Sequence, residues 1–411
     1  MIEFEKTKLA NGLTLIVHQD KSTPIVAFNL LYDVGSKHES ANRTGFAHLF
    51  EHLMFEGSEN IPSFDTPLQL IGAQNNAFTS TDVTNYYITV PKENLETAFW
   101  LESDRLNNLA FSEESLRLQK NVVIEEFKQR YLNQPYGDMW LKLRPLAYQV
   151  HPYQWATIGK NTDHIEEATL DEVKAFFNKH YKPQNAILVV AGDVEFESVV
   201  KLTEKWFGGI NKPDEPRAKL PLEPVQTERR TQTIKGNVPQ NAIYMAFKMP
   251  SRREEDYVAV DLVSDVLSRG DSSRFYQKLI KGKQLFSEID AYVSGEMERG
   301  LFVVAGKLRD GISFKEAEAA IWEEINLICN ELVSQEELEK SVNKVESTLA
   351  FSEMEVLNKA MNLAFAELHS DASLVNEEIN QYLKATVQDI QKAAQDYLRP
   401  EKASVLFYEK A

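Results

Sequence analysis

The sequence predicts an α+β protein made of two similar halves, and three observations lead to this prediction. At 411 residues the chain exceeds the size at which one hydrophobic core stops growing, so two domains are expected. Short apolar segments with the period of a strand alternate with long segments that have the period of a helix. A pattern of residues in the first half of the chain also returns in the second half.

The elements of the first half can be assigned from these periods. Three apolar segments predict strands: GLTLIVHQD (12–20), AFNLLYDV (27–34) and NYYITV (85–90). The segment ENLETAFWLESDRLNNL (93–109) has helical spacing instead. Because strands and helices are mixed along the chain, the class is α+β.

The repeat is clearest near the end of each half. TLDEVKAFFNKHYKPQNAILVV starts at Thr169, and the similar TVQDIQKAAQDYLRPEKASVLF starts at Thr386, 217 residues later. Each copy predicts a Thr-capped helix, then Pro fourteen residues after the Thr, then a strand. A second, weaker pairing, with an offset of 213, sets His48, Glu51 and His52 opposite Asp261, Ser264 and Asp265. This is the pattern expected of a duplicated domain in which one half keeps a site.

The division between the halves is predicted at NKPDEPRAKLPLEPV, because this segment holds four of the fifteen prolines and has little apolar periodicity. We therefore predict domains at 1–210 and 226–411, joined by a linker at 211–225. The net charge of −17 and the pI near 5.1 argue against a nucleic-acid partner, which needs concentrated Lys and Arg. The apolar runs are too short to span a membrane, and the expected location is cytoplasmic, or periplasmic if the numbering is that of a mature chain.

The most informative segment is GFAHLFEHLMFEGS (45–58), which carries His48, Glu51 and His52. A helix from about residue 44 to residue 55 puts four apolar side chains on one side and these three residues on the other. Two imidazoles one turn apart suit a divalent ion such as zinc, and the glutamate between them can reach a water on it. The alternative is a polar helix face that points at solvent.

A catalytic zinc needs a third protein ligand, and the segment SEESLRLQKNVVIEEFKQRYLNQPYG (112–137) offers Glu125 and Glu126. At about 100° per residue, Glu126 falls beside the apolar stripe of this helix and Glu125 falls on the opposite, polar side. A buried carboxylate requires a compensating charge, so Glu126 is the predicted ligand. The alternative for Glu126 is an ion pair with Arg130, one turn away.

The His-x-x-Glu-His pattern resembles the inverted zinc motif of the pitrilysin and insulinase peptidases, and the chain is similar to their bacterial, mitochondrial-processing-peptidase-like branch. GAQNNAFTSTDVTNYYITV resembles the family's substrate-binding strand, and VVIEEFKQRYLNQPYG resembles the helix with the third ligand. The resemblance implies two homologous domains, each a mainly antiparallel sheet backed by helices, which form a clam-like chamber. It covers nearly the whole chain.

By this resemblance His48, His52 and Glu126 bind one Zn²⁺ per chain, and Glu51 is the catalytic general base. Asn76 and Ala77 match the strand along which a peptide substrate adds through main-chain hydrogen bonds. The ligand set itself does not distinguish zinc from manganese or cobalt.

Two positions depart from the family's pattern. Gln119 stands where many relatives have a second glutamate, seven residues before the third ligand. An Arg and a Tyr that hold substrate in the second half are missing, because the matching positions are Phe302 and Arg309. We therefore expect a dimer, either of identical chains or with a related zinc-free chain that carries the missing pair.

The sequence thus predicts a zinc-dependent endopeptidase that hydrolyses oligopeptides or unfolded polypeptide segments inside a chamber. Two alternatives remain open. The first is a catalytic subunit that is active only with a zinc-free partner chain, and the second is a non-catalytic assembly subunit of the same fold. The intact ligands argue against the second alternative.

Overall fold

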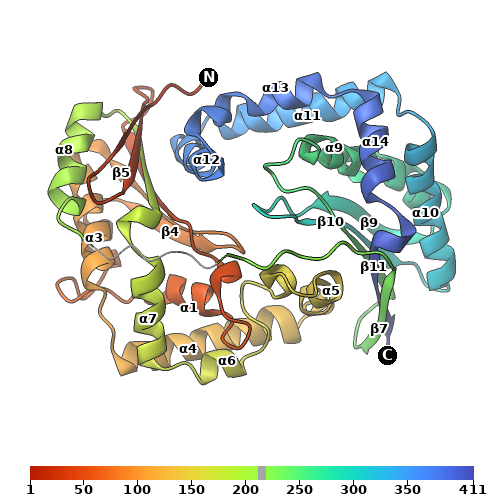
Figure 1. Cartoon of the computed structure of the whole chain (residues 1–411), viewed down its shortest axis with the longest axis horizontal. Helices are drawn as coiled ribbons and strands as arrows, with labels where there is room; N and C mark the ends of the chain where they lie inside the picture. The colour runs from red at the N-terminus through yellow and green to blue at the C-terminus, as the bar shows by residue number, and fades with distance from the viewer. Residues whose placement is uncertain (212–218) are drawn as a thin grey trace. The chain divides into compact units, whose positions relative to one another are not determined.

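The computed structural model describes residues 1–211 and 219–411, which form two compact units (Figure 1). Unit 1 comprises Met1–Phe127, Trp155–Leu220 and Ala350–Glu377, and unit 2 comprises Lys128–Gln154, Pro221–Leu349 and Glu378–Ala411. The predicted linker, 211–225, falls partly on residues 212–218, which lie outside the described residues.

Unit 1 is built on a six-stranded sheet with the order β1-β2-β6-β3-β5-β4. Its strands are β1 (Glu5–Lys8), β2 (Thr14–Gln19), β3 (Ile25–Tyr32), β4 (Gln74–Thr79), β5 (Thr84–Pro91) and β6 (Ala186–Gly192). Only the β2–β6 pair is parallel, so the sheet is mainly antiparallel, as predicted. The strand β4, which carries Asn76 and Ala77, lies at one edge.

Both faces of this sheet are covered by helices. The helices of unit 1 are α1 (Phe46–Leu53), α2 (Asp65–Leu70), α3 (Leu95–Asn108), α4 (Glu113–Phe127), α6 (Asp163–Glu166), α7 (Leu170–His180), α8 (Phe196–Phe207) and α12 (Val356–His369). On one face Phe28 of β3 packs against Phe99 of α3 and Phe207 of α8. On the other face Leu31 joins a buried cluster with Leu363 of α12. A strand buried on both faces explains why β3 is continuously apolar.

Unit 2 repeats this plan on a five-stranded sheet with the order β7-β11-β8-β10-β9. Its strands are β7 (Arg230–Gly236), β8 (Ala242–Lys248), β9 (Phe286–Val293), β10 (Leu301–Leu308) and β11 (Ala403–Lys410). Again one pair, β7–β11, is parallel and the others are antiparallel. The fold is therefore α+β with two sheets of the same kind, each backed by helices, as the sequence predicts.

The helices of unit 2 also cover two faces. They are α5 (Met139–Ala147), α9 (Tyr257–Ser268), α10 (Phe314–Asn330), α11 (Gln335–Ser352, which enters unit 1 at residue 350), α13 (Glu378–Lys384) and α14 (Val387–Tyr397). The side chains of α9, α10 and α14 form the larger core with one face of the sheet. On the other face Leu143 and Ala147 of α5 pack with Tyr244 and Leu406.

Two helices pack against the sheet of the opposite half of the sequence. α5, from the first half, covers the second sheet, while α12, from the second half, covers the first sheet (Figure 1). The compact units therefore differ from the continuous ranges 1–210 and 226–411 by this exchange. Periodicity identifies a helix, but it does not say against which sheet the apolar face of that helix packs.

The end of each half follows the repeat closely. Thr169 caps α7 through a capping box with Glu172, and Thr386 caps α14 through the same arrangement with Asp389. The strands β6 and β11 follow at the predicted places. The Thr-capped helices predicted from the repeat are thus confirmed.

The longest helix, α11, has 18 residues and carries charged side chains along its length. Within the ranges 1–211 and 219–411, none of the helices combines the length and the apolar character that a membrane span needs.

Candidate metal centre

The helix α1 carries the His-x-x-Glu-His pattern, and its two sides are sorted as predicted. Phe46, Leu49, Phe50 and Leu53 are buried, whereas His48, Glu51 and His52 are half-buried on the other side. The helix begins after Gly45, whose φ of 89° lies in the left-handed region. A Cβ atom at Gly45 would lie 2.7 Å from the Ile158 carbonyl oxygen, so only glycine fits this turn.

The first turn of α1 is capped by a side chain from outside the helix. The buried carboxylate of Glu39 accepts hydrogen bonds from the backbone N–H of Gly45 at 2.9 Å and of Ala47 at 2.8 Å. Burial raises the pKa of Glu39 to about 8, although the two backbone donors oppose this shift. This contact fixes the start of the motif helix one turn before His48.

His48, His52 and Glu126 converge on one point. A carboxylate oxygen of Glu126 lies 3.7 Å from Nε2 of His48 and 3.4 Å from Nε2 of His52. The two imidazole rings stand 4.8 Å apart and nearly perpendicular to each other. The side chains are 13%, 22% and 18% exposed, so the cluster is half-buried and reachable from solvent. Glu125, the other candidate on α4, is exposed.

This cluster fits a zinc ion by its chemistry and by its spacing. Two imidazole nitrogens and one carboxylate oxygen are a donor set of catalytic zinc, which keeps a fourth position for water or substrate. Bonds of about 2.0–2.1 Å in a tetrahedral site place neighbouring ligand atoms roughly 3.3 Å apart. The three ligand atoms lie within 4.8 Å of one another, and no other set of three metal-ligating side chains meets this criterion among residues 1–211 and 219–411.

Glu51 lies beside the end of the edge strand β4. Oγ1 of Thr79 donates a hydrogen bond of 2.5 Å to Oε2 of Glu51. Behind this pair the hydroxyls of Tyr86 and Tyr181 are 3.3 Å apart and fully buried. Burial, with a smaller contribution from Glu51, raises the pKa of Tyr181 to about 12. The Tyr181 hydroxyl therefore stays protonated and uncharged at neutral pH.

The predicted substrate-binding residues lie on β4, with their strand neighbours on one side only. Asn76 pairs with Tyr87 and Ala77 pairs with Tyr86, and β4 has no second strand partner within the described residues. The backbone N–H of Ala77 donates to Oδ1 of Asn76 at 2.8 Å. This amide is therefore held by a side chain and not by a neighbouring strand.

The structure shows the contacts of Gln119, Phe302 and Arg309, the positions that depart from the family's pattern. Gln119 donates a hydrogen bond from Nε2 to the carboxylate of Glu56, which follows His52 by one turn. A negative charge thus stands next to position 119 although residue 119 itself has none. In unit 2 Phe302 is buried in β10, and the guanidinium of Arg309 donates to the Phe286 carbonyl oxygen.

The residues that the repeat sets opposite the motif lie on α9 of unit 2. Tyr382 donates a hydrogen bond of 2.7 Å to Asp261, and Arg269 pairs with Asp265 at 2.9 Å. Burial raises the pKa of Asp265 to about 6 and also raises the pKa of Asp261. Ser264 donates to the carbonyl oxygen of Asp261. The side chains of Asp261, Ser264 and Asp265 are thus engaged in hydrogen bonds and an ion pair within unit 2.

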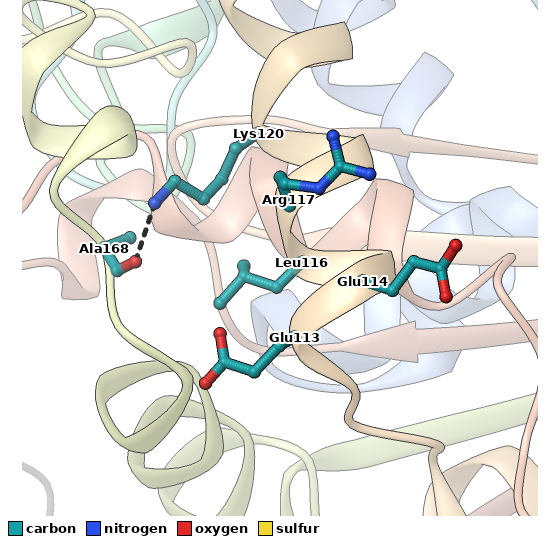
Figure 2. Close-up of a pocket in the computed structure, with 6 residues that line it drawn as sticks. All are labelled: Glu113, Glu114, Leu116, Arg117, Lys120 and Ala168. Carbon is teal, nitrogen blue, oxygen red and sulfur yellow. Dashed lines mark hydrogen bonds between the residues drawn. The ribbon is translucent and has the colours of Figure 1, made fainter.

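A separate depression of about 370 Å³ lies on the surface of α4 (Figure 2). It is lined by Glu113, Glu114, Leu116, Arg117, Lys120 and Ala168. Lys120 crosses it to donate to the Ala168 carbonyl oxygen at 2.9 Å. Its lining mixes both charges and includes none of His48, His52 and Glu126, so it is distinct from the candidate metal centre.

Comparison with known families decides the classification. The model described as Insulinase (Peptidase family M16) matches residues 14–149, and the model described as Peptidase M16 inactive domain matches residues 167–345. The chain belongs to peptidase family M16. His48, Glu51, His52 and Glu126 all lie within the range matched by the first model, and the hydrogen-bonded acidic residues of α9 lie within the second.

Individual relatives match between half and nearly all of the chain. The zinc protease PqqE of Helicobacter pylori is 29% identical over 98% of this chain and 92% of its own length. The mitochondrial-processing peptidase subunit beta of Saccharomyces cerevisiae is 28% identical over 51% of this chain and 46% of its own. The crystal structure of a protease from Helicobacter pylori has a TM-score of 0.93 at 27% identity, with full coverage of both chains.

Sequence reasoning missed two residues of this site. Thr79 lies in the strand segment that the resemblance singles out, but threonine in a strand has no special signal of its own. Glu39 lies six residues before Gly45 and caps the motif helix from a separate turn. The remote cap could have been suspected only from the lack of Ser, Thr, Asp or Asn at the Gly45 position.

Proposed function

We propose that this M16 chain is a zinc-dependent endopeptidase that hydrolyses oligopeptides or unfolded polypeptide segments. The observation that carries the proposal is the convergence of His48, His52 and Glu126 on one point, with Glu51 on the same face of α1. The names of the relatives as zinc proteases support it. We propose one zinc ion per chain, held by these three side chains.

A zinc ion bound there would lower the pKa of a coordinated water and polarise the carbonyl of a peptide. Glu51 would act as the general base, which accepts a proton from the attacking water and passes it to the leaving amine. The half-buried position of Glu51, on the motif face and beside β4, suits both transfers.

The substrate would add as an antiparallel strand along the free edge of β4. The backbone N–H of Ala77 would exchange its bond to the Asn76 side chain for a bond to a substrate carbonyl oxygen. This N–H would therefore be hydrogen-bonded both before and after binding. A main-chain mode of binding favours extended, unfolded segments over folded proteins. Main-chain binding also tolerates different side chains, so the enzyme would cleave many peptides and not a single one. Enclosure of the site in a clam-like chamber is part of the proposal.

The test is metal content and cleavage of a quenched, unstructured peptide library by the purified chain, beside Glu51→Gln and Glu126→Gln. We expect about one zinc per wild-type chain. Glu51→Gln should keep the zinc and lose at least a hundredfold in activity, because it removes only the base. Glu126→Gln should lose both, while Glu125→Gln, on the exposed side of α4, serves as the matched control. A wild-type chain that binds no metal would refute the assigned ligands.

A second candidate is a catalytic subunit that needs a zinc-free partner chain. Two observations favour it, because the Arg and Tyr that hold substrate in relatives would stand at positions 302 and 309. Phe302 is buried, and the Arg309 guanidinium donates to the Phe286 carbonyl oxygen. One relative is named as a subunit, which supports the same idea. A chain that binds zinc but cuts only after its partner is added would support this candidate. A mass of one chain under all conditions would contradict both the homodimer and the heterodimer, and zinc without cleavage in any assembly would favour the non-catalytic assembly subunit.

A further inference from the structure

The hydrogen bond between Thr79 and Glu51 joins two elements that are 28 residues apart in the sequence. Oγ1 of Thr79 donates this hydrogen bond to Oε2 of Glu51 at 2.5 Å. Both partners are half-buried, so water competes for this contact less than at an open surface.

The alternation of side chains along β4 explains why Thr79 faces α1. Phe78 points to the opposite side of the sheet, where its ring stacks at 6.3 Å on Phe365 of α12. Ala77 and Thr79, one residue to either side, therefore face α1. Ala77 is small enough for α1 to approach, and Thr79 supplies the hydroxyl.

The strand around Thr79 is held firmly. Thr79 pairs with Thr84 of β5, whose hydroxyl is buried and donates to the Val34 carbonyl oxygen at 2.9 Å. Directly after Thr79 the chain turns, and the turn is closed by the bond from Ser80 N–H to the Val83 carbonyl oxygen at 2.8 Å. A functional group is best oriented by a partner that is itself fixed by packing and hydrogen bonds, as Thr79 is.

The same strand thus has two roles in the proposed reaction. Its outer edge, at Asn76 and Ala77, would receive the substrate, and Thr79, two residues further on, holds the base. A rigid strand of this length keeps a fixed distance between the bound peptide and the Glu51 carboxylate. A general base must lie within hydrogen-bond reach of the proton that it takes, so this distance matters for the rate.

We propose that Thr79 is a positioning residue, which fixes the Glu51 carboxylate in register with a peptide bound along β4. This inference rests on the proposed peptidase function. The side chain of Thr79 contacts Glu51 through its hydroxyl. It acts through Glu51.

The first experiment compares Thr79→Val, which keeps the shape and removes the hydroxyl, with Thr79→Ser, which keeps the hydroxyl. Thr79→Val should lower kcat about 10- to 100-fold, since a displaced catalytic group costs up to this much. KM should change less than about twofold and the zinc content should be unchanged, because the substrate edge and the ligands are intact. Thr79→Ser should recover most of kcat. Thr233→Val, at an exposed threonine of β7, is the matched control.

The inference would be overturned by an unchanged kcat in Thr79→Val, by a rise in KM alone, or by a Thr79→Ser variant as slow as Thr79→Val. Loss of zinc in Thr79→Val would do the same, because it would indicate a structural role.

A double-mutant cycle tests the contact without any need for cleavage. Thr79→Val should lower the Tm of the wild-type chain and leave the Tm of Glu51→Ala unchanged, because the hydroxyl then has no carboxylate to bind. Equal losses in both backgrounds would overturn the inference. If the wild-type chain cuts no peptide in any assembly, the proposed function fails, and the cycle still decides whether Thr79 orients Glu51.

Discussion

Replacing Glu39 with glutamine tests whether a buried carboxylic acid caps the motif helix in its neutral form. Glutamine has nearly the same shape and carries no charge at any pH. Its amide nitrogen cannot accept an N–H bond, so the variant also loses one of the two cap bonds, and this loss is the same at every pH. Glu39 is buried, and its cap on α1 consists of the two bonds to Gly45 and Ala47. Desolvation raises its pKa from 4.5 to about 8, and the backbone donors only reduce this effect.

The sign of the pH effect follows from this shift. Between the unfolded pKa of 4.5 and the folded pKa of about 8, the folded chain holds a proton that the unfolded chain has released. The stabilisation from this proton is complete below the unfolded pKa and is lost as the pH rises through the folded pKa. The slope is roughly 1.4 kcal/mol per pH unit, so wild type should lose about 3 kcal/mol relative to Glu39→Gln between pH 5.5 and pH 7.5.

The assay is equilibrium urea unfolding of wild type and Glu39→Gln at several pH values, with each transition fitted separately because the chain has two compact units. The difference between the two proteins cancels the titration of all other groups. A difference that does not vary between pH 5.5 and pH 8.5 would refute the reasoning. It would mean that the N-terminus of α1 stabilises an ionised Glu39 more than burial destabilises it.

Three further predictions concern packing, charge and metal. Leu363→Ala removes a fully buried side chain of α12 and should lower the free energy of unfolding, measured by urea titration, by about 2–5 kcal/mol. The control Leu383→Ala, at a side chain that is 56% exposed, should change this free energy by less than about 0.5 kcal/mol. Gln119→Glu places a second carboxylate against Glu56 and should cost about 1–3 kcal/mol more at pH 8 than at pH 5, and Glu56→Gln in the same chain should abolish this difference. Chelation should lower the Tm of wild type reversibly, with recovery on added zinc, and should not affect Glu126→Gln; equal responses of the two proteins would contradict the ligand assignment.

Local features were predicted well because neighbouring residues decide them. The motif helix was expected at about residues 44 to 55 and spans Phe46–Leu53, with its apolar and polar sides as predicted. The choice between Glu125 and Glu126 came from helical geometry alone, and Glu126 is the one that faces the histidines. The N-terminus of α4 also follows a local rule, since the Ser112 hydroxyl accepts a hydrogen bond from Ser115 N–H.

Features that depend on distant residues were not predicted. On α4 the apolar side chain of Val122 is 42% exposed, because the neighbours of a helix face come from other elements. The cap by Glu39 and the contact of Thr79 with Glu51 each join separate parts of the chain. Neither leaves a mark in the local pattern of residues.

The exchange of α5 and α12 limits how far the two halves of the repeat can act as separate domains. The face of the first sheet away from α3 and α8 is apolar at Ile16, Leu31 and Val189, and α12 covers it with Leu363. Residues 1–210 alone would expose this face to water, at a cost of about 25 cal/mol for each Å² of apolar surface. The first sheet thus depends on α12, a helix that lies about 150 residues beyond the end of the first half. Because Thr79 belongs to the edge strand of this sheet, its contact with Glu51 depends on α12 as well. For this reason the half that carries His48, His52 and Glu126 and the half that carries α12 are expected to have been retained together.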